Sequence, residues 1–176
     1  LLAREGQEGL RQAVLESLAR QAQRPRLDVQ LARGGRATTV EAERQLQFTF
    51  LSLPEAPVEP VGGMALVAGN EARTPSLEVR NRSGRTVRYF EVGWIIRDAD
   101  GRDYLAGSVP ASDPDLSLSP GQTSRVRQDA SLRFAAAPGR PLSIAGMTGF
   151  VSQVEFADGS VWVPAREALS EPRLSR

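Results

Sequence analysis

The sequence of 176 residues contains no cysteine and no histidine, and all 22 of its basic side chains are arginines because lysine is absent as well. Without cysteine the chain forms no disulfide and has no thiol nucleophile. Without cysteine and histidine together it lacks the usual zinc ligands. The missing histidine removes the commonest general base, and the missing lysine removes Schiff-base chemistry. We therefore predict a non-enzymatic protein that binds no cofactor and no metal.

Neither sign of charge dominates, since 22 positive side chains face 21 negative ones and leave a net charge of +1. Such a balance creates no field that would select nucleic acid, which is not expected as a partner. The longest apolar run, Met64–Ala68, is far shorter than the ~20 residues of a membrane-spanning helix. Leu1 at the start is compatible with an upstream signal peptide or membrane anchor, and the sequence does not decide between them.

Residues 1–24 are predicted to form a helix. Leu10, Val14 and Leu18 recur every four residues among arginine, glutamine, glutamate and alanine, which gives one narrow apolar stripe. Pro25 ends the helix because it forces the preceding residue out of the helical region. A stripe this thin suits a helix that packs on one side or serves as a stalk.

Residues 25–53 change to a period of two, which is typical of half-buried strands. We expect a β-hairpin with a turn at Gly34-Gly35, followed by an extended run up to Leu53. This run either closes the chain's own fold or pairs with a partner protein or a second copy. The second alternative defines candidate partner contacts in the helix and the run: Leu10, Val14, Leu18, Leu46, Phe48 and Phe50.

Residues 54–63 carry three prolines and two glycines and are expected to form a linker or wide loop. Short alternating segments separated by turn residues follow, and Asp158-Gly159 indicates a hairpin near the end. Trp94 lies in the strongest of these strands and is expected in the core. The final residues, 165–176, read as a polar tail. The expected strands cover 77–81, 87–97, 103–105, 123–128, 150–156 and 160–163.

The runs LEVRNRSGRTVRYFEVGWIIRDADGRDY, LSPGQTSRV and VEFADGSVWVP resemble the bacterial immunoglobulin-like and fibronectin-III-like domains, over about residues 75–164. The resemblance rests on a strand ending in Asn81, a core aromatic on the next strand, and a Leu-x-Pro-Gly turn at 118–121. It implies a mainly β fold, an immunoglobulin-like antiparallel β-sandwich over 64–164, preceded by the helix and the hairpin. Members of such families are mostly binding, spacer or assembly modules.

The aspartates of DADGRD, namely Asp98, Asp100 and Asp103, have the alternate spacing of a calcium loop. Position five of that loop is Arg102, however, and position twelve is Val109 where a bidentate glutamate is needed. We therefore reject a metal site here and expect a hairpin turn.

Arg80, Arg82, Arg85 and Arg88 surround one turn. They form either an anion-binding patch, because guanidinium groups grip carboxylates and phosphates, or a solvated rim that keeps a sheet edge from aggregating.

Tyr89, Tyr104 and Trp162 either line a sugar-binding strip or pack in the core and at its edges. Glu91 and Glu155 are both expected on the face opposite the core, as paired carboxylates or as ordinary surface groups.

These observations predict an interaction or structural subunit of a bacterial extracytoplasmic assembly, periplasmic or secreted, in which the helix and residues 26–53 contact a partner or a sister subunit. The alternative is an accessory domain that binds a glycan or an anionic polymer through Tyr104, Trp162 or the arginines from Arg80 to Arg88.

Overall fold

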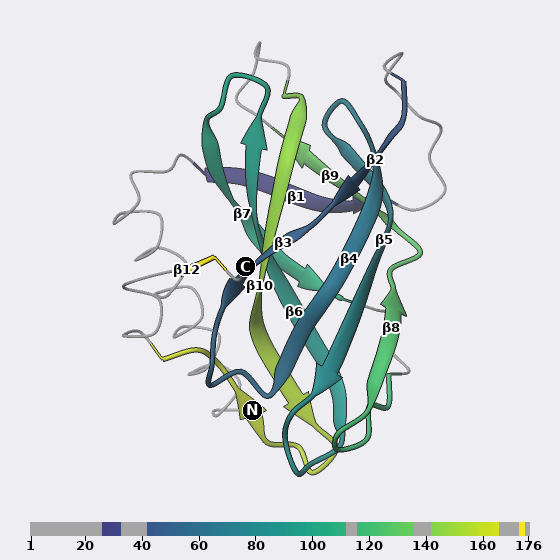
Figure 1. Ribbon diagram of the computed structural model, residues 1–176, viewed down its shortest axis with the longest axis vertical. Helices are drawn as coiled ribbons and strands as arrows, with labels where there is room; N and C mark the ends of the chain where they lie inside the picture. Colours follow the sequence, from purple (N-terminus) through teal and green to yellow (C-terminus); the bar gives the residue numbers. More distant parts are fainter. Residues whose placement is uncertain (1–25, 33–41, 112–115, 136–141, 166–172, 175–176) are drawn as a thin grey trace.

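The computed structural model describes residues 26–32, 42–111, 116–135, 142–165 and 173–174 (Figure 1). Within these ranges the chain forms β-strands and no helix, so the expectation of a mainly β protein is confirmed, and no helix there could cross a membrane. The predicted helix over 1–24 lies outside the described residues. The strands are β1 (Arg26–Ala32), β2 (Arg44–Gln47), β3 (Thr49–Ser52), β4 (Val58–Ala68), β5 (Glu71–Asn81), β6 (Val87–Asp98), β7 (Asp103–Pro110), β8 (Thr123–Arg127), β9 (Ser131–Ala135), β10 (Ile144–Phe156), β11 (Val161–Trp162) and β12 (Arg173–Leu174).

The strands fall into two layers that face each other (Figure 1). In the first layer, β6 lies between β10 and β7, and β11 pairs with the end of β10. In the second layer, β5 lies between β4 and the consecutive strands β8 and β9, while β2 pairs with the outer edge of β4. Trp94 of the first layer and Leu77 and Leu132 of the second line a gap with only ≈ 10 Å³ of free space. Buried side chains of both layers, Trp94, Leu77 and Leu132 among them, form one hydrophobic core.

Two segments join the layers at their edges. On one side, Arg26 and Leu27 of β1 pair with β7, and the rest of β1 pairs with β9. On the other side, β2 pairs with β4 while β3 pairs with β10, and only Phe48 separates these two strands. The strands from β12 to β2 therefore form one continuous hydrogen-bonded sheet, which is nearly closed like a barrel.

The expected N-terminal hairpin stays a prediction, because its turn at Gly34-Gly35 lies outside the described residues; β1 itself pairs with β7 and β9. The alternation of residues 26–32 and 44–52 did indicate strands. Alternation says which face of a strand is buried, but it does not say which strand lies beside it.

The expected linker over 54–63 is largely wrong, because Val58–Ala68 forms a single strand of 11 residues. Pro60 lies where the register between β4 and β5 shifts, and no described strand pairs with Val58–Gly62 on the side away from β5. Proline is tolerated at such bulges and free edges because it has no backbone N–H to donate. The loop is thus confined to residues 54–57.

Several other expectations are confirmed. Trp94 is only 2% exposed. Val154 of β10 pairs with Trp162 of β11 across the turn at Asp158-Gly159. Asn81 is buried, and its Nδ2 donates to the carbonyl oxygens of Arg85 (2.8 Å) and Leu118 (2.9 Å), which explains why an amide stands at the end of β5. The predicted polar tail differs at one place, since Arg173 and Leu174 pair with β3.

Candidate functional site

The outer surface of the second layer carries a groove of ≈ 630 Å³ that crosses β2, β4, β5 and β8. Successive residues of a strand point to opposite faces, so the buried side chains of Leu77, Val79 and Val126 direct their neighbours outward. The residues that line the groove are Gln45, Gln47, Phe48, Val61, Gly62, Gly63, Met64, Ala65, Leu66, Thr74, Ser76, Glu78, Arg125 and Arg127.

Two adjacent glycines lie on the floor of the groove, and only Gly62 faces its open space. A Cβ on Gly63 would lie 2.7 Å from the carbonyl oxygen of Ser76 and 2.8 Å from the ring of Phe48, so only glycine fits there. A Cβ on Gly62 would meet no atom within 4 Å. A Cβ at position 62 would therefore point into open space.

A β-bulge exposes an apolar side chain at the edge of this floor. The register between β4 and β5 passes from Pro60 directly to Gly62, which leaves Val61 as the extra residue. Val61 is 51% exposed, and it is the one large hydrophobic side chain that is exposed among the described residues. Bulges re-aim side chains in this way, often beside functional sites.

One wall of the groove is positively charged. Arg125 and Arg127 of β8 are exposed and lie on the same face as Glu78, which is the register neighbour of Arg125. Within the described residues no ion pair within 4.0 Å involves Arg125, Arg127 or Glu78. Guanidinium groups stay charged at every physiological pH, so this wall can receive carboxylates or other anions.

No family model matches this chain, and a search of the curated proteins finds no match. What can be said of the site therefore comes from its own geometry.

The predicted partner contacts in the extended run are placed inside the protein. Phe48 and Phe50 are 7% and 6% exposed and belong to the core between the layers, while Leu46 is half-buried and packs against that core. The structure thus follows the first of the two alternatives, intramolecular closure, and these side chains are not free for a partner in this fold. Leu10, Val14 and Leu18 lie outside the described residues.

The four arginines considered either as an anion-binding patch or as a solvated rim do not form one site. Arg85 lies 3.8 Å above the Phe156 ring and donates to Ser160, and Arg88 lies 3.8 Å from a carboxylate oxygen of Glu155. Arg80 is exposed on the outer face of the second layer. The strand and turn geometry therefore spreads the cluster over different surfaces.

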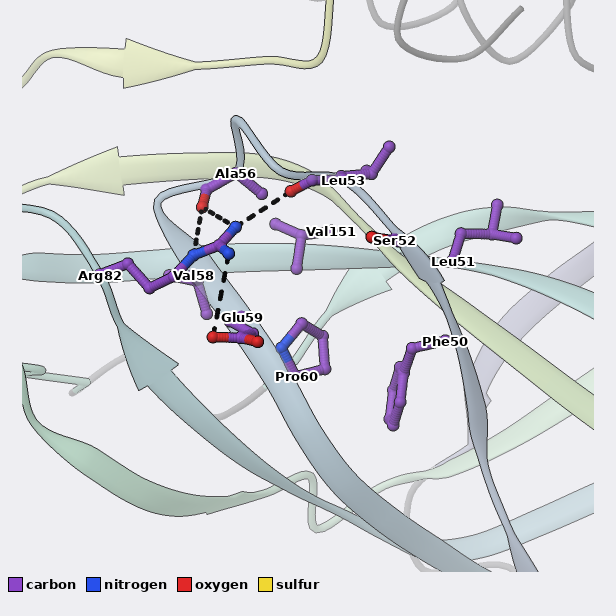
Figure 2. A pocket seen from close by; sticks show the side chains of 10 residues that line it. All are labelled: Phe50, Leu51, Ser52, Leu53, Ala56, Val58, Glu59, Pro60, Arg82 and Val151. Carbon is purple, nitrogen blue, oxygen red and sulfur yellow. Dashed lines mark hydrogen bonds and ion pairs between the residues drawn. The ribbon is translucent and has the colours of Figure 1, made fainter. Parts of the chain in front are cut away.

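Arg82 has a structural role of its own (Figure 2). Its Nη2 donates to the carbonyl oxygens of Leu53 (3.0 Å) and Ala56 (2.8 Å), its Nε donates to Ala56 (3.2 Å), and its Nη1 lies 3.9 Å from Glu59. The guanidinium fills the end of a small cavity of ≈ 60 Å³ beside the loop at 54–57. Arg82 is thus occupied by backbone carbonyls.

The rejected calcium loop is a hydrogen-bonded turn. The Oδ1 of Asp98 accepts from the backbone amides of Asp100 and Arg102, both at 2.9 Å, while Asp103 pairs with Arg97 at 3.0 Å. Burial raises the pKa of Asp98, but hydrogen bonds from the Arg102 amide, the Tyr104 hydroxyl and the Asp100 amide outweigh it and hold this pKa below 3.8. Among the described residues no group of three or more histidine, cysteine, aspartate or glutamate side chains could hold a metal ion.

The three candidate sugar-binding aromatics are not aligned. Tyr104 of β7 lies in one row of paired residues with Ile96 of β6 and Met147 of β10. Trp162 of β11 lies in another row, beside Val154 of β10. Seven residues along β10 separate these two rows, or roughly 23 Å at the rise of a strand.

Tyr89 donates to Glu91 at 2.9 Å and is the register neighbour of Glu155. Glu91 and Glu155 are thus neighbours on the outer face of the first layer, where both are largely buried.

Sequence reasoning missed the groove. Arg125 and Arg127 lay in a strand that was expected, and the glycine pair at 62 and 63 was visible but was interpreted as a linker. An exposed Val61 follows from the bulge, and the bulge follows from the pairing of β4 with β5. The only local signal was a glycine pair directly before the apolar run Met64–Ala68.

Proposed function

We propose that this protein is a non-enzymatic interaction module of a bacterial extracytoplasmic assembly, and that it holds a protein partner in the groove of its second layer. The observation that carries the proposal is the groove itself, ≈ 630 Å³ in volume, with Val61 exposed at its edge. Val61 lies beside the half-buried Met64 and Leu66, and an apolar strip bordered by polar and charged side chains suits a binding surface.

The strand order supports an immunoglobulin-like scaffold for this role. The order β4-β5-β8 in one layer and β11-β10-β6-β7 in the other is compatible with such a sandwich, although β2 and β9 also pair within the first of these layers. The two bridging segments, β1 and β2–β3, go beyond a plain sandwich. By closing the edges they leave the outer faces as the natural place for contacts.

The chemistry of the groove also supports binding rather than catalysis. Its ionisable lining residues are Glu78, Arg125 and Arg127, a single carboxylate beside two permanently charged guanidinium groups. General acid–base catalysis needs a group that exchanges a proton near neutral pH at the reacting atoms. The groove instead offers shape, charge and amide hydrogen-bonding groups from Gln45 and Gln47, which are what recognition requires.

The proposal moves the contact surface away from the extended run. Removing residues 1–53 would delete β1, β2 and β3, so such a truncation would test folding rather than assembly. Residues 1–24 keep their predicted role as a packing or stalk segment, and the extracytoplasmic location also stays a prediction.

Site-specific photo-crosslinking in cells of the native host tests the proposal. A benzophenone amino acid at position 61 is expected to form an adduct with a discrete protein, and the same amino acid at the exposed position 145 of β10 is expected to form none. A Cβ at position 62 meets no atom within 4 Å, so Gly62→Phe is expected to place its ring in the groove and to abolish the adduct. Equal adducts from positions 61 and 145, or an adduct that Gly62→Phe leaves unchanged, would overturn the proposal.

A second candidate function, an accessory domain for an anionic polymer, is favoured by Arg80, Arg125 and Arg127, which share one exposed face. Retention on a polyphosphate or heparin matrix that fades steeply with salt would support it. If the polymer lies over the whole face, Gly62→Phe should leave this retention unchanged, because the polymer need not enter the groove. A loss of retention in Gly62→Phe would mean that the polymer binds in the groove instead.

A further inference from the structure

We infer that the occupant of the groove is an extended peptide segment whose acidic side chains stand at alternate positions. This inference rests on the proposed function, because it names the chemical class of partner that the same groove would take. It is carried by the placement of charge on β8, by the apolar and amide groups on β4 and β2, and by the composition of the groove surface.

The spacing of the charged wall supplies the first step. Arg125 and Arg127 are two positions apart on β8, and both point out of the second layer because Val126 between them is buried. Alternate residues of a strand lie about 6.8 Å apart, which is also the spacing of alternate side chains in an extended peptide. Carboxylates at alternate positions of such a peptide can each pair with one guanidinium.

The opposite wall complements the other side chains and the backbone of the peptide. Val61, Met64 and Leu66 of β4 present aliphatic surface, and Gln45 and Gln47 of β2 present amides. A primary amide both donates and accepts hydrogen bonds, so it can pair with either polar group of a peptide bond. The groove therefore combines anion pairing on one side with apolar and backbone contacts on the other.

Glu78 makes the groove selective among acidic ligands. It stands directly opposite Arg125 in the register of β5 and β8, between the charged wall and the floor. A ligand with a continuous row of negative charge would place some of that charge against this carboxylate, which is unfavourable. A segment in which neutral residues separate the acidic ones avoids this repulsion.

The groove surface disfavours nucleic acids and glycans. Among the described residues that line it, Phe48 is the one aromatic side chain, and this ring is buried between the layers. Single-stranded nucleic acids and sugar rings are usually held by stacking on exposed aromatic side chains, which this groove does not provide. A peptide needs no such platform.

Fluorescence anisotropy with two labelled peptides of identical composition tests the inference on the intact chain. One peptide is Gly-Asp-Val-Asp-Ser-Asp-Val-Asp-Gly, and its block isomer Gly-Asp-Asp-Val-Ser-Asp-Asp-Val-Gly gathers the acids into two adjacent pairs, so that no two of them stand two positions apart. We expect the alternating peptide to bind about tenfold more tightly than the block isomer, because two properly spaced charge pairs then form together. Its affinity should fall as salt rises.

Three variants locate the binding. Arg125→Glu and Gly62→Phe should each weaken binding of the alternating peptide by about tenfold or more. Arg80→Glu makes the same change in net charge on the same face but outside the groove lining, and it should leave binding within about twofold. Circular dichroism of each variant shows whether it is folded.

The outcomes separate this inference from the proposed function. Equal affinity for the two isomers, or equal losses from Arg80→Glu and Arg125→Glu, would overturn the inference, and it would also be overturned if polyphosphate bound more tightly than the alternating peptide. If Gly62→Phe still abolished the crosslink from position 61, the groove would remain the partner site with a different occupant. If Gly62→Phe left that crosslink unchanged, the proposed function itself would fail.

Discussion

The ring of Phe48 lies edge-on against the indole of Trp94, with ring centroids 4.7 Å apart and planes inclined by 62°. Trp94 belongs to the central strand of the first layer, whereas Phe48 belongs to the segment that crosses from the second layer to the first. Edge-to-face pairs of aromatic rings contribute beyond the area they bury. This contact therefore fastens the closing segment to the middle of the core.

Replacing Phe48 should weaken the whole fold. We expect Phe48→Ala to lower the free energy of unfolding by about 3–5 kcal/mol, since the variant loses buried apolar area and leaves a cavity beside Trp94. Urea denaturation followed by tryptophan fluorescence measures this loss. Gln47→Ala, one residue earlier and exposed, is the control and should change stability by less than about 0.5 kcal/mol. Equal stability of the two variants would show that Phe48 does not close the barrel.

Gly93 is a second position at which packing leaves no choice. A Cβ there would lie 2.3 Å from Cζ of Phe150, whose ring is completely buried. Gly93→Ala should therefore destabilise the protein by about 1–3 kcal/mol through overpacking, as measured by thermal or urea unfolding.

Two further variants show whether the clash is the cause. Adding Phe150→Leu to Gly93→Ala should recover part of the loss because the smaller side chain makes room. Gly84→Ala should have little effect, since a Cβ at position 84 meets no atom within 4 Å. A double variant that is less stable than both single variants would contradict this explanation.

The clamp formed by Arg82 predicts a difference between neighbouring arginines. Arg82→Ala leaves the carbonyl oxygens of Leu53 and Ala56 without their donor and should cost about 1–3 kcal/mol in the free energy of unfolding. Arg82→Lys should recover only part of this, because an ammonium group lacks the planar fork that spans the two carbonyls.

The exposed Arg80, two residues away, provides the matched control. Arg80→Ala removes the same charge but no hydrogen bond in the described part of the chain, so its effect should stay within about 0.5 kcal/mol. Hydrogen exchange should also quicken at the amides of Glu55 and Ala56 in Arg82→Ala and not in Arg80→Ala. Identical unfolding midpoints for the two variants would argue against the clamp.

The turn at Asp98 predicts a loss of stability in acid. The folded state holds the pKa of Asp98 below 3.8, so its carboxylate stabilises the fold above that pH. As the pH falls through the lower pKa of the folded state, the carboxyl is protonated and this contribution disappears. The urea midpoint should therefore drop as the pH is lowered below about 4.

Asp98→Asn tests the assignment, because an amide cannot titrate and should flatten part of this dependence. Asp100→Asn removes a carboxylate from the same turn, at an exposed position, and should leave the acid dependence close to that of the parent chain. Curves for Asp98→Asn that parallel those of the parent at every pH would mean that other carboxyl groups are responsible.

The groove illustrates why the candidate site was harder to predict than the strands. The alternation that places Arg125 and Arg127 on one face was present in the sequence, as was the glycine pair at 62 and 63. These residues are about sixty positions apart in the chain, and they meet because β4 and β8 both pair with β5. Pairing between distant strands has no signature within either strand.

By itself, the sequence determined that this protein is built from strands, where most of them run, and that Trp94 is buried, because the period of apolar residues and the turn residues are local properties of the chain. Only the tertiary structure decided that β1 and the segment around Phe48 close the edges of two layers, and that Val61 is pushed outward. Those outcomes depend on which backbone groups hydrogen-bond across the fold, and on the space that packed side chains leave at Gly62 and Gly63.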